Sequence, residues 1–194
     1  WQQADCGEGR HPSIRVDDVF GPSVCRPSEY NLGVGNANVI SFYDDGTWPH
    51  GATALALTSV IFRVETGEIL DADMEINGST LFSTGDELQS GAYDLLSVVT
   101  HEAGHFLGID HTTVPNATMT PRYGPGQDNL RTLEADDVAA ICEAYPPDRR
   151  AEACDYTPRH GFSPDCAMVP SYAQACSLGP VGAGAPIGWG GWLV

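Results

Sequence analysis

The string HEAGHFLGIDH at residues 101–111 constrains this chain more than any other feature of its sequence. Apolar residues around the string recur at helical spacing, which predicts that it begins on a helix. Residues four apart on a helix project from one face, so His101 and His105 can both reach one ion. Gly108 can adopt a positive φ and end the helix sharply, which brings His111 back as a third ligand. Three imidazoles that leave one coordination position open are typical of a catalytic zinc site.

Glu102 is the candidate general base. On a helix it is rotated by about 100° from His101, so it flanks the ion and is not expected to be a ligand. Zinc lowers the pKa of a bound water towards about 7. Glu102 would accept the proton of that water, the hydroxide would attack a peptide carbonyl, and Glu102 would deliver the proton to the leaving amine. The alternative, three histidines without a common role, needs the whole string to arise by coincidence.

The string is the signature of the metzincins, and ATMTPRY at residues 117–123 resembles the Met-turn of their matrixin branch. The resemblance implies that Met119 lies beneath the zinc histidines as a hydrophobic floor that does not bind the metal. It also implies that Pro121 and Tyr123 form a wall of the pocket for the residue after the scissile bond. An ordinary core methionine and a half-exposed loop tyrosine are the alternatives. The resemblance covers residues 13–147.

Alternating patterns predict strands at residues 13–19, 38–43, 52–64 and 69–77, and helical patterns predict helices at 94–107 and about 133–145. Thr132 is the expected N-cap of the last helix, and Pro146-Pro147 ends it. The resemblance implies an α+β fold with a twisted mixed sheet packed on the active-site helix and a C-terminal helix. It also implies an edge strand that binds extended substrate as an added strand, formed by Ala54, Leu55, Ala56 and Leu57 together with Thr58.

Three acidic residues, Asp71, Asp73 and Glu75, fall on one face of the predicted strand at 69–77, with apolar residues on the other. This alternation predicts a half-buried strand with an acidic outer face. The resemblance makes these residues candidate calcium ligands, although an acidic outer face needs no ion, and both alternatives stay open. His50 stands alone where animal matrixins carry a His/Asp cluster for a second zinc, so no second zinc is expected.

The chain has a formal net charge of −17, with 26 acidic and 9 basic residues. This excess of acid argues against nucleic acid or anionic lipid as a partner, because both need Lys and Arg. The substrates expected are proteins or peptides, and no segment is long and apolar enough to span a membrane. A monomer is expected.

Six cysteines without C-x-x-C spacing indicate disulfides and an oxidising compartment, which predicts a secreted or extracellular protein. Six cysteines allow 15 pairings. Cys6 with Cys25 is the expected first bridge, which leaves the other four cysteines for the C-terminal part.

Composition divides the chain into a catalytic domain at residues 1–147, a Cys-rich appendage at 148–178 and a Gly-rich apolar tail at 179–194. The strand and long helix that begin a matrixin domain are not visible, and the chain starts at Trp1, so a processed or truncated product is expected. Cys176-Ser177 and the following run loosely resemble the start of a myxobacterial surface-sorting tag. This resemblance indicates a bacterial protein with cell-surface association, and a flexible terminus is the alternative.

The function expected from these features is a secreted zinc-dependent endopeptidase. Two other functions stay open. The first is an inactive zinc-holding surface or binding module, and the second is a zinc amidase or toxin-type enzyme with a narrow substrate.

Overall fold

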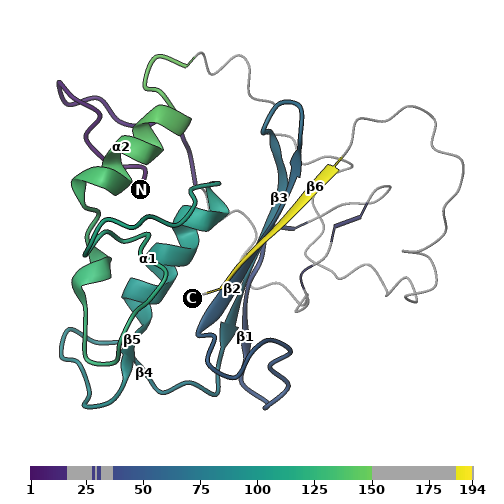
Figure 1. Cartoon of the computed structure of the whole chain (residues 1–194), viewed down its shortest axis with the longest axis vertical. Coiled ribbons are helices and arrows are strands. Elements are labelled where there is room, and N and C mark those ends of the chain that lie inside the picture. Colours follow the sequence, from purple (N-terminus) through teal and green to yellow (C-terminus); the bar gives the residue numbers. More distant parts are fainter. Residues whose placement is uncertain (17–27, 29, 32–36, 150–186, 194) are drawn as a thin grey trace, which may run out of the picture.

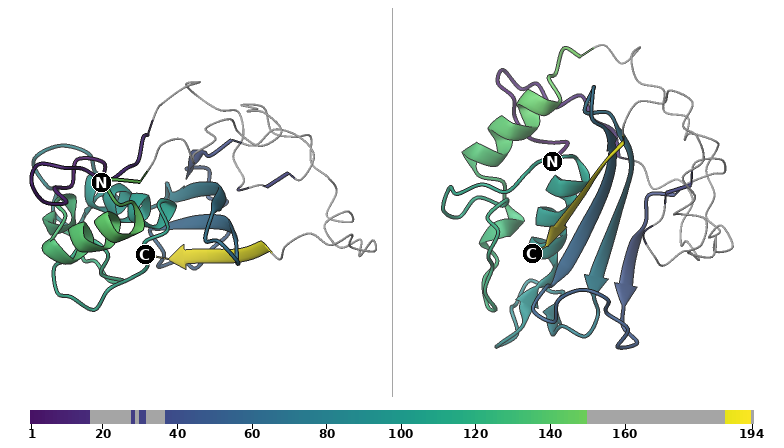
Figure 2. Two further views of the ribbon diagram at one scale, coloured as in Figure 1. Left: turned by 90° about the horizontal axis from the view of Figure 1, so that it is seen from above. Right: turned by 45° about the vertical axis from the view of Figure 1, so that its right-hand side comes forward.

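A computed structural model describes residues 1–16, 28, 30–31, 37–149 and 187–193 of the chain. Its larger elements form three layers, with the helix α1 between a twisted β-sheet and the helix α2 (Figures 1 and 2). The mixed sheet and two helices confirm the predicted α+β class.

The main sheet has the strand order β1-β3-β2-β6. Its strands are β1 (Ile40–Tyr43), β2 (Ala56–Arg63), β3 (Ile69–Asn77) and β6 (Ile187–Leu193). β1 runs parallel to β3, whereas β2 is antiparallel to both β3 and β6, so the sheet is mixed. The strand predicted at 69–77 is confirmed to the residue, and those predicted at 38–43 and 52–64 are confirmed with later starts. Residues 13–16 form no strand, so that part of the strand predicted at 13–19 is wrong, and 17–19 lie outside the described residues.

The predicted half-buried character of β3 is wrong, because both of its faces are buried. Asp71, Asp73 and Glu75 are 2%, 1% and 5% exposed, as enclosed as the apolar residues between them. Protein groups satisfy part of this acidic face. Asp73 Oδ1 accepts a hydrogen bond from the Val39 nitrogen at 2.9 Å, and Glu75 Oε1 accepts one from the Tyr43 hydroxyl at 2.5 Å. The alternating pattern assigns these residues to the correct faces of the strand. It does not predict whether solvent or another segment covers each face.

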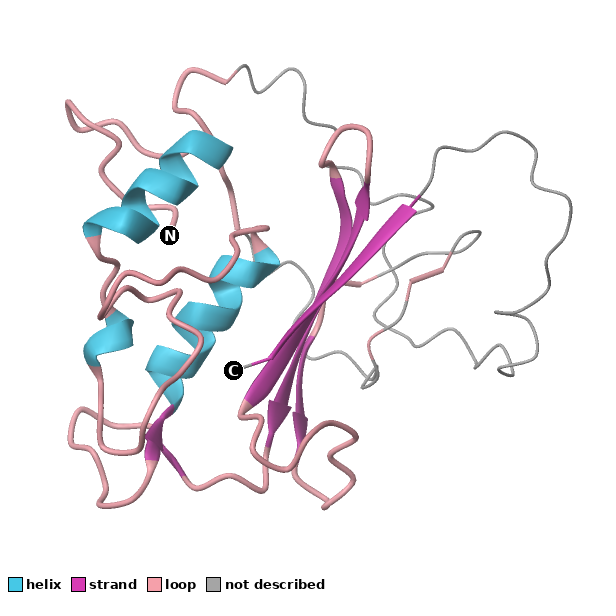
Figure 3. Ribbon diagram, viewed as in Figure 1, coloured by secondary structure: helices cyan, strands magenta, loops and turns pink. Residues whose placement is uncertain are grey.

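Two short parallel strands, β4 (Phe82–Ser83) and β5 (Tyr93–Asp94), lead into α1 (Leu95–Phe106). Asp94 is the N-cap of α1, and its Oδ2 accepts a hydrogen bond from the Ser97 nitrogen at 2.9 Å. Arg131, at the end of the 3-10 helix η1 (Asn129–Arg131), donates to both oxygens of Asp94 at 2.7 Å. The start of α1 is therefore fixed from outside the helix. Figure 3 shows the loops that connect α1 to η1 and α2.

The last helix, α2, spans Ala135–Ala144 and confirms the helix predicted near 133–145. Its N-cap is Glu134, so the prediction of Thr132 is wrong. Glu134 and Asp137 form a capping box, in which each side chain accepts a hydrogen bond from the backbone of the other. Thr132 lies two residues earlier in extended backbone, and its carbonyl accepts a hydrogen bond from the Thr118 hydroxyl at 3.2 Å.

Two apolar clusters enclose α1. On the sheet side, Val98 packs with Leu55, Ala56, Met74 and Ile76. On the α2 side, the cluster contains Ala4, Ile109, Met119 and Ile141, with Trp1 packed against it. The helix that carries the histidine string thus lies inside the domain, which holds its side chains rigidly.

A disulfide joins Cys6 to Cys142 of α2, so the expected Cys6–Cys25 bridge is wrong. The N-terminal segment runs beside α2, where the Ser13 nitrogen donates to the Tyr145 carbonyl at 3.0 Å, and this brings residues 136 positions apart together. Sequence spacing favoured a local pair, but the packing of two distant segments decides the connectivity.

β6 lies within the predicted Gly-rich tail and adds a strand to the sheet. Residues 150–186, and with them His160 and most of the predicted appendage at 148–178, lie outside the described residues. The predicted division of the chain into domains therefore stays a prediction. No helix in the described part of the chain is long and apolar enough to cross a membrane.

Candidate metal centre

The buried side of α1 carries His101, Glu102 and His105, and each of them is 0% exposed. The helix ends as the sequence predicts. Gly108 has a φ of +82° and its nitrogen donates to the His105 carbonyl at 2.8 Å, while the Ile109 nitrogen donates to the Gly104 carbonyl at 2.9 Å. These two bonds make a Schellman motif, which reverses the chain after the helix.

The turn brings His111 to the two helical histidines. The three Nε2 atoms lie 3.0 Å apart for His101 and His105, 3.2 Å for His101 and His111, and 3.1 Å for His105 and His111. A tetrahedral zinc site with bonds of 2.0–2.1 Å separates its nitrogens by about 3.3 Å. Among the residues that the structure describes, these three histidines are the only group of three or more metal-type ligands close enough to share one ion.

The other ring nitrogens show why the Nε2 atoms of the helical histidines face one another. His101 Nδ1 donates to the Thr118 carbonyl at 2.6 Å, and His105 Nδ1 donates to the Ile109 carbonyl at 2.8 Å. In a neutral imidazole the proton is then on Nδ1, and Nε2 presents a lone pair. Two lone pairs 3.0 Å apart repel unless a cation lies between them, so the arrangement fits a metal ion.

Burial keeps the helical histidines neutral. It lowers the pKa of His101 to about 4 and that of His105 to about 3, against the weaker opposing effects of their carbonyl partners. Burial also lowers the pKa of His111. A metal ligand must be deprotonated at the binding nitrogen, so at neutral pH all three are ready to bind.

Glu102 lies beside the triad with its two carboxylate oxygens in different surroundings. Oε2 accepts a hydrogen bond from the Thr58 hydroxyl of β2 at 2.5 Å, whereas Oε1 is buried and has no hydrogen-bond partner in the described part of the chain. Burial raises the pKa of Glu102 to about 8 in the metal-free protein, and the bond from Thr58 opposes this rise. A nearby dication favours the carboxylate, so a bound metal would bring this pKa down again.

Met119 lies in the apolar cluster on the α2 side of α1, and its role as a floor beneath the histidines stays a prediction. It is 1% exposed and contacts α1 at Gly104, where a Cβ atom would overlap its sulfur and lie 2.6 Å from the Trp1 ring. The Met119 carbonyl accepts a hydrogen bond from the Thr112 nitrogen at 2.9 Å, directly after His111. Glycine at 104 is therefore required for the methionine to reach the helix that carries the ligands.

The family model named Matrixin matches residues 17–146. The chain belongs to the matrixin family. Macrophage metalloelastase of Oryctolagus cuniculus is similar, with 42% identity over 73 residues, which are 36% of this chain and 16% of that protein. Matrilysin of Homo sapiens is 34% identical over 79 residues, which are 41% of this chain and 28% of that protein. Metalloendoproteinase 1-MMP of Arabidopsis thaliana is 34% identical over 77 residues, 38% of this chain and 21% of that protein. The chain therefore spans less than a third of the length of these relatives.

Tyr123 of this matrixin lies beside the sheet-side core, where it packs against the cluster around Leu55 and Val98. Its ring centroid is 6.1 Å from that of Tyr93, and its hydroxyl donates to the Gln127 carbonyl. Pro121 is exposed in the same loop. Tyr123 thus packs the loop after Met119 against the segment that leads into β2, and its role as a pocket wall stays a prediction.

The predicted substrate-binding edge lies partly outside β2. Ala54 and Leu55 precede the strand, and their carbonyls accept hydrogen bonds from Asn77 at 3.1 and 2.9 Å. Ala56 begins the strand, and all three residues and Leu57 are buried. From Leu57 to Arg63 the outer edge of β2 is paired with β6, with Leu57 opposite Leu193 and Thr58 opposite Trp192.

The candidate calcium ligands are not gathered around a point within the described residues, where only the histidines form a metal-type cluster. Glu75 Oε2 also lies 2.9 Å from His50 Nε2, so the carboxylate has two side-chain partners. These contacts need no ion, and calcium stays a prediction.

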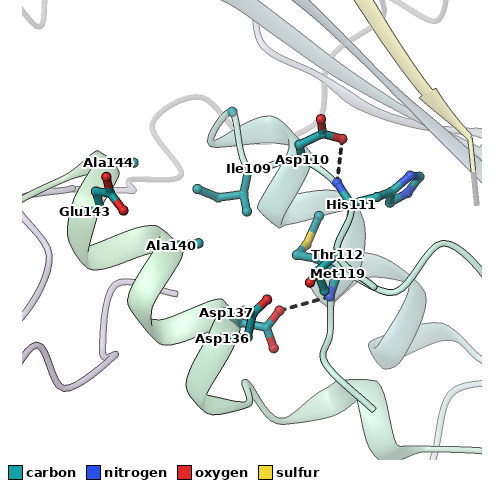
Figure 4. Close-up of a pocket in the computed structure, with 11 residues that line it drawn as sticks. Ile109, Asp110, His111, Thr112, Met119, Asp136, Asp137, Ala140, Glu143 and Ala144 are labelled. Carbon is teal, nitrogen blue, oxygen red and sulfur yellow. Dashed lines mark hydrogen bonds between the residues drawn. The ribbon is translucent and has the colours of Figure 1, made fainter. Parts of the chain in front are cut away.

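A pocket of about 400 Å³ opens between the chain after α1 and the helix α2 (Figure 4). Its lining includes His111 and Met119 but neither Glu102 nor the helical histidines, so it lies beside the metal centre and not over it. Asp136, Asp137 and Glu143 of α2 give it an acidic wall.

Sequence reasoning assigned no role at the centre to Asp137, Thr118, Gly104 or Arg131, and treated Thr58 only as part of the substrate edge. Asp137 accepts hydrogen bonds from the nitrogens of Thr118 and Met119, at 2.7 and 3.0 Å. Acidic residues in the first turn of a helix, such as Asp136 and Asp137, are normally explained by their favourable interaction with the helix dipole. That explanation gives no sign that Asp137 also accepts hydrogen bonds from the turn at Thr118 and Met119.

Proposed function

We propose that this matrixin is a secreted zinc-dependent endopeptidase. The observation that carries the proposal is the meeting of three Nε2 atoms within 3.2 Å of one another, together with a buried carboxylate oxygen of the adjoining residue Glu102 that has no partner in the described part of the chain. The names of the rabbit and plant relatives, a metalloelastase and a metalloendoproteinase, support the same activity.

His101, His105 and His111 would hold the metal through Nε2. A zinc ion in this position would polarise a substrate carbonyl and acidify a water molecule. Hydrogen bonds to the carbonyls of Thr118 and Ile109 fix the rings of His101 and His105. These two histidines therefore need little rearrangement to bind a metal ion. Met119 would serve as the floor of the centre, because it supports α1 without a ligand atom in the triad.

Glu102 would transfer the proton in this reaction. Its Oε1 would accept the proton of the attacking water and then give it to the nitrogen of the leaving amine. The atom suits this role because it is buried, belongs to the residue next to His101 in α1, and is not committed to another hydrogen bond in the described part of the chain. Burial favours the protonated form of Glu102, which helps the carboxylate to take a proton during the reaction.

Ala54 and Leu55, which lead into β2, and Ala56 and Leu57, which begin it next to Thr58, would contact the extended backbone of the substrate. Tyr123 and Pro121 would line the pocket for the residue after the scissile bond. Backbone pairing tolerates many sequences, which suits an enzyme that cuts within proteins.

The secreted location rests on the disulfide between Cys6 and Cys142, because such bridges persist mainly in oxidising compartments. Calcium at Asp71, Asp73 and Glu75 would add to the order of the sheet but is not needed for this chemistry.

The test combines proteolysis with metal analysis on one sample. The wild-type protein should bind about one zinc per chain and digest casein or gelatin, and a hydroxamate chelator should stop the digestion. Glu102→Ala should keep the zinc and lose cleavage by several orders of magnitude, because base and metal act together. Glu65→Gln, in an exposed turn, is the matched carboxylate control and should cleave normally. A folded, zinc-loaded wild-type protein that cuts no protein would favour an inactive zinc-holding module, and cleavage of only one narrow substrate class would favour a specialised amidase.

A further inference from the structure

Thr58 brings a hydroxyl from the sheet to the candidate general base. The residue is in β2, is 0% exposed, and places Oγ1 2.5 Å from Glu102 Oε2. The same Oγ1 lies 3.3 Å from the backbone carbonyl of Glu102. A hydroxyl carries one hydrogen, and the shorter contact to a carboxylate oxygen is the stronger bond. Thr58 therefore donates to Oε2 when Glu102 is ionised.

The contact makes the two oxygens of Glu102 unequal. Rotation about the last bond of the side chain is soft, so a glutamate without a partner can present either oxygen. In this site Oε2 is held by Thr58, and Oε1 remains without a hydrogen-bond partner in the described part of the chain. Since Thr58 is on a central strand of the sheet and Glu102 is on α1, the bond also fixes the carboxylate relative to the strand.

We infer that Thr58 is a positioning residue for proton transfer, which holds Oε2 so that Oε1 alone exchanges protons with the reacting groups. The inference rests on the proposed function and assigns Thr58 a part in it. Oε1 would take the proton of the water and return it to the leaving amine, while the hydrogen of Thr58 stays on Oγ1. No net charge or proton moves to Thr58 in the cycle.

The test compares Thr58→Val with Thr58→Ser in the full chain loaded with zinc. Valine keeps the shape of threonine without its hydroxyl, so kcat should fall by roughly 10- to 100-fold, with KM within about twofold. Serine restores the hydroxyl and should recover most of the loss in kcat. Ser41→Ala removes a buried hydroxyl of β1 that has no hydrogen-bond partner among the described residues, and it should change neither constant. Zinc content should be equal in all four proteins.

A double-mutant cycle in the metal-free protein provides a readout that does not depend on activity. Thr58→Val should lower the urea midpoint of the wild type, and it should lower the midpoint of Glu102→Ala by less than half as much, because its partner is then absent. Equal shifts in the two backgrounds, or a Thr58→Val enzyme with wild-type kcat, would overturn the inference. If the wild type shows no zinc-dependent cleavage, the proposed function fails by itself, and the urea midpoints still decide whether the Thr58 contact exists.

Discussion

Asp137 accepts a hydrogen bond from the backbone nitrogen of Met119 at 3.0 Å, across 18 residues of sequence (Figure 4). Its other oxygen accepts from the nitrogens of Thr118 and Glu134 at 2.7 and 2.8 Å. The Thr118 carbonyl in turn accepts from His101 Nδ1. A side chain of α2 thus holds the turn that orients His101, one of the three candidate metal ligands.

The first prediction concerns Asp137 itself. Asp137→Ala should weaken zinc binding by roughly 10- to 100-fold, because outer partners of ligating histidines have effects of this size. It should also lower the free energy of unfolding by about 2–4 kcal/mol, since three buried or half-buried backbone donors lose their acceptor. Competition with a coloured chelator measures the affinity, and urea unfolding measures the stability. Asp136→Asn, the neighbour on the same helix, is the control and should change neither. Unchanged affinity in Asp137→Ala would show that the turn holds its shape without the carboxylate.

The second prediction concerns Asp94 and Arg131 at the start of α1. Burial alone would raise the pKa of Asp94, but hydrogen bonds from Arg131 and Ser97 outweigh it and lower that pKa below its ordinary value. A group with a lowered folded-state pKa stabilises the fold at pH values above about 4, and this stability is lost as pH falls through the folded value. The melting temperature of Arg131→Ala should therefore be several degrees below that of the wild type at pH 7. This difference in melting temperature should become smaller below about pH 4.

Thermal melts from pH 2.5 to 8 check this. The control is Arg63→Ala, which removes a surface ion pair with Glu68 at 2.9 Å and should shift the melting temperature little at any pH. A melting difference that stays constant down to the lowest pH would contradict the role of Asp94.

The third prediction concerns removal of the metal. A ligand present at 1,000 times its Kd stabilises the folded state by about 4 kcal/mol, so a strong chelator should lower the melting temperature by many degrees. His111→Ala should bind zinc weakly, so the chelator should lower its melting temperature much less than that of the wild type. His11→Gln, an exposed histidine outside the triad, should keep the full effect. An equal chelator shift in His111→Ala and the wild type would place the stabilising metal elsewhere.

The fourth prediction concerns β6 and rests on the proposed function. β6 occupies the outer edge of β2 from Leu57 to Arg63, and its last pairs lie opposite Leu57 and Thr58, beside Glu102. An extended substrate that pairs with this edge would have to displace it. Deletion of residues 187–194 should therefore lower KM for long peptides by roughly 3- to 30-fold, which corresponds to about 0.6–2 kcal/mol of binding free energy, with little change for short peptides.

Two substitutions within β6 refine the fourth prediction. Gly190→Pro removes a backbone donor from a residue paired with Val60, and it should act like the deletion. Gly190→Ala keeps the donor and should behave like the wild type. Faster cleavage of short and long peptides alike after deletion would point to a cause other than competition for the edge.

The sequence predicted the elements whose pattern is local. The period of residues 94–107 identified α1, the alternation of β3 gave its bounds, and the glycine at 108 marked the turn that brings His111 to the triad. The burial of Asp71 and Asp73 could not be predicted, because a carboxylate on a strand looks the same whether it faces water or a covering segment. The meeting of His101, His105 and His111 was predictable because the spacing that one metal ion needs is visible in the sequence.

The supporting contacts were harder to predict because they join residues that are far apart in sequence. Thr58 meets Glu102 across 44 residues, and Arg131 meets Asp94 across 37. The sequence gives no reason for a glycine at position 104 of the histidine string, yet a side chain there would overlap Met119. Cys6 pairs with Cys142 because the N-terminal segment packs on α2. The spacing of cysteines in the sequence does not predict this packing.

The bond between Cys6 and Cys142 has a practical consequence whenever a protease cuts this chain. A single nick anywhere from residue 7 to residue 141 leaves the two fragments joined through their sulfurs. Nicked molecules would then migrate at full size on a gel without reductant, and their fragments would separate only once thiols are added.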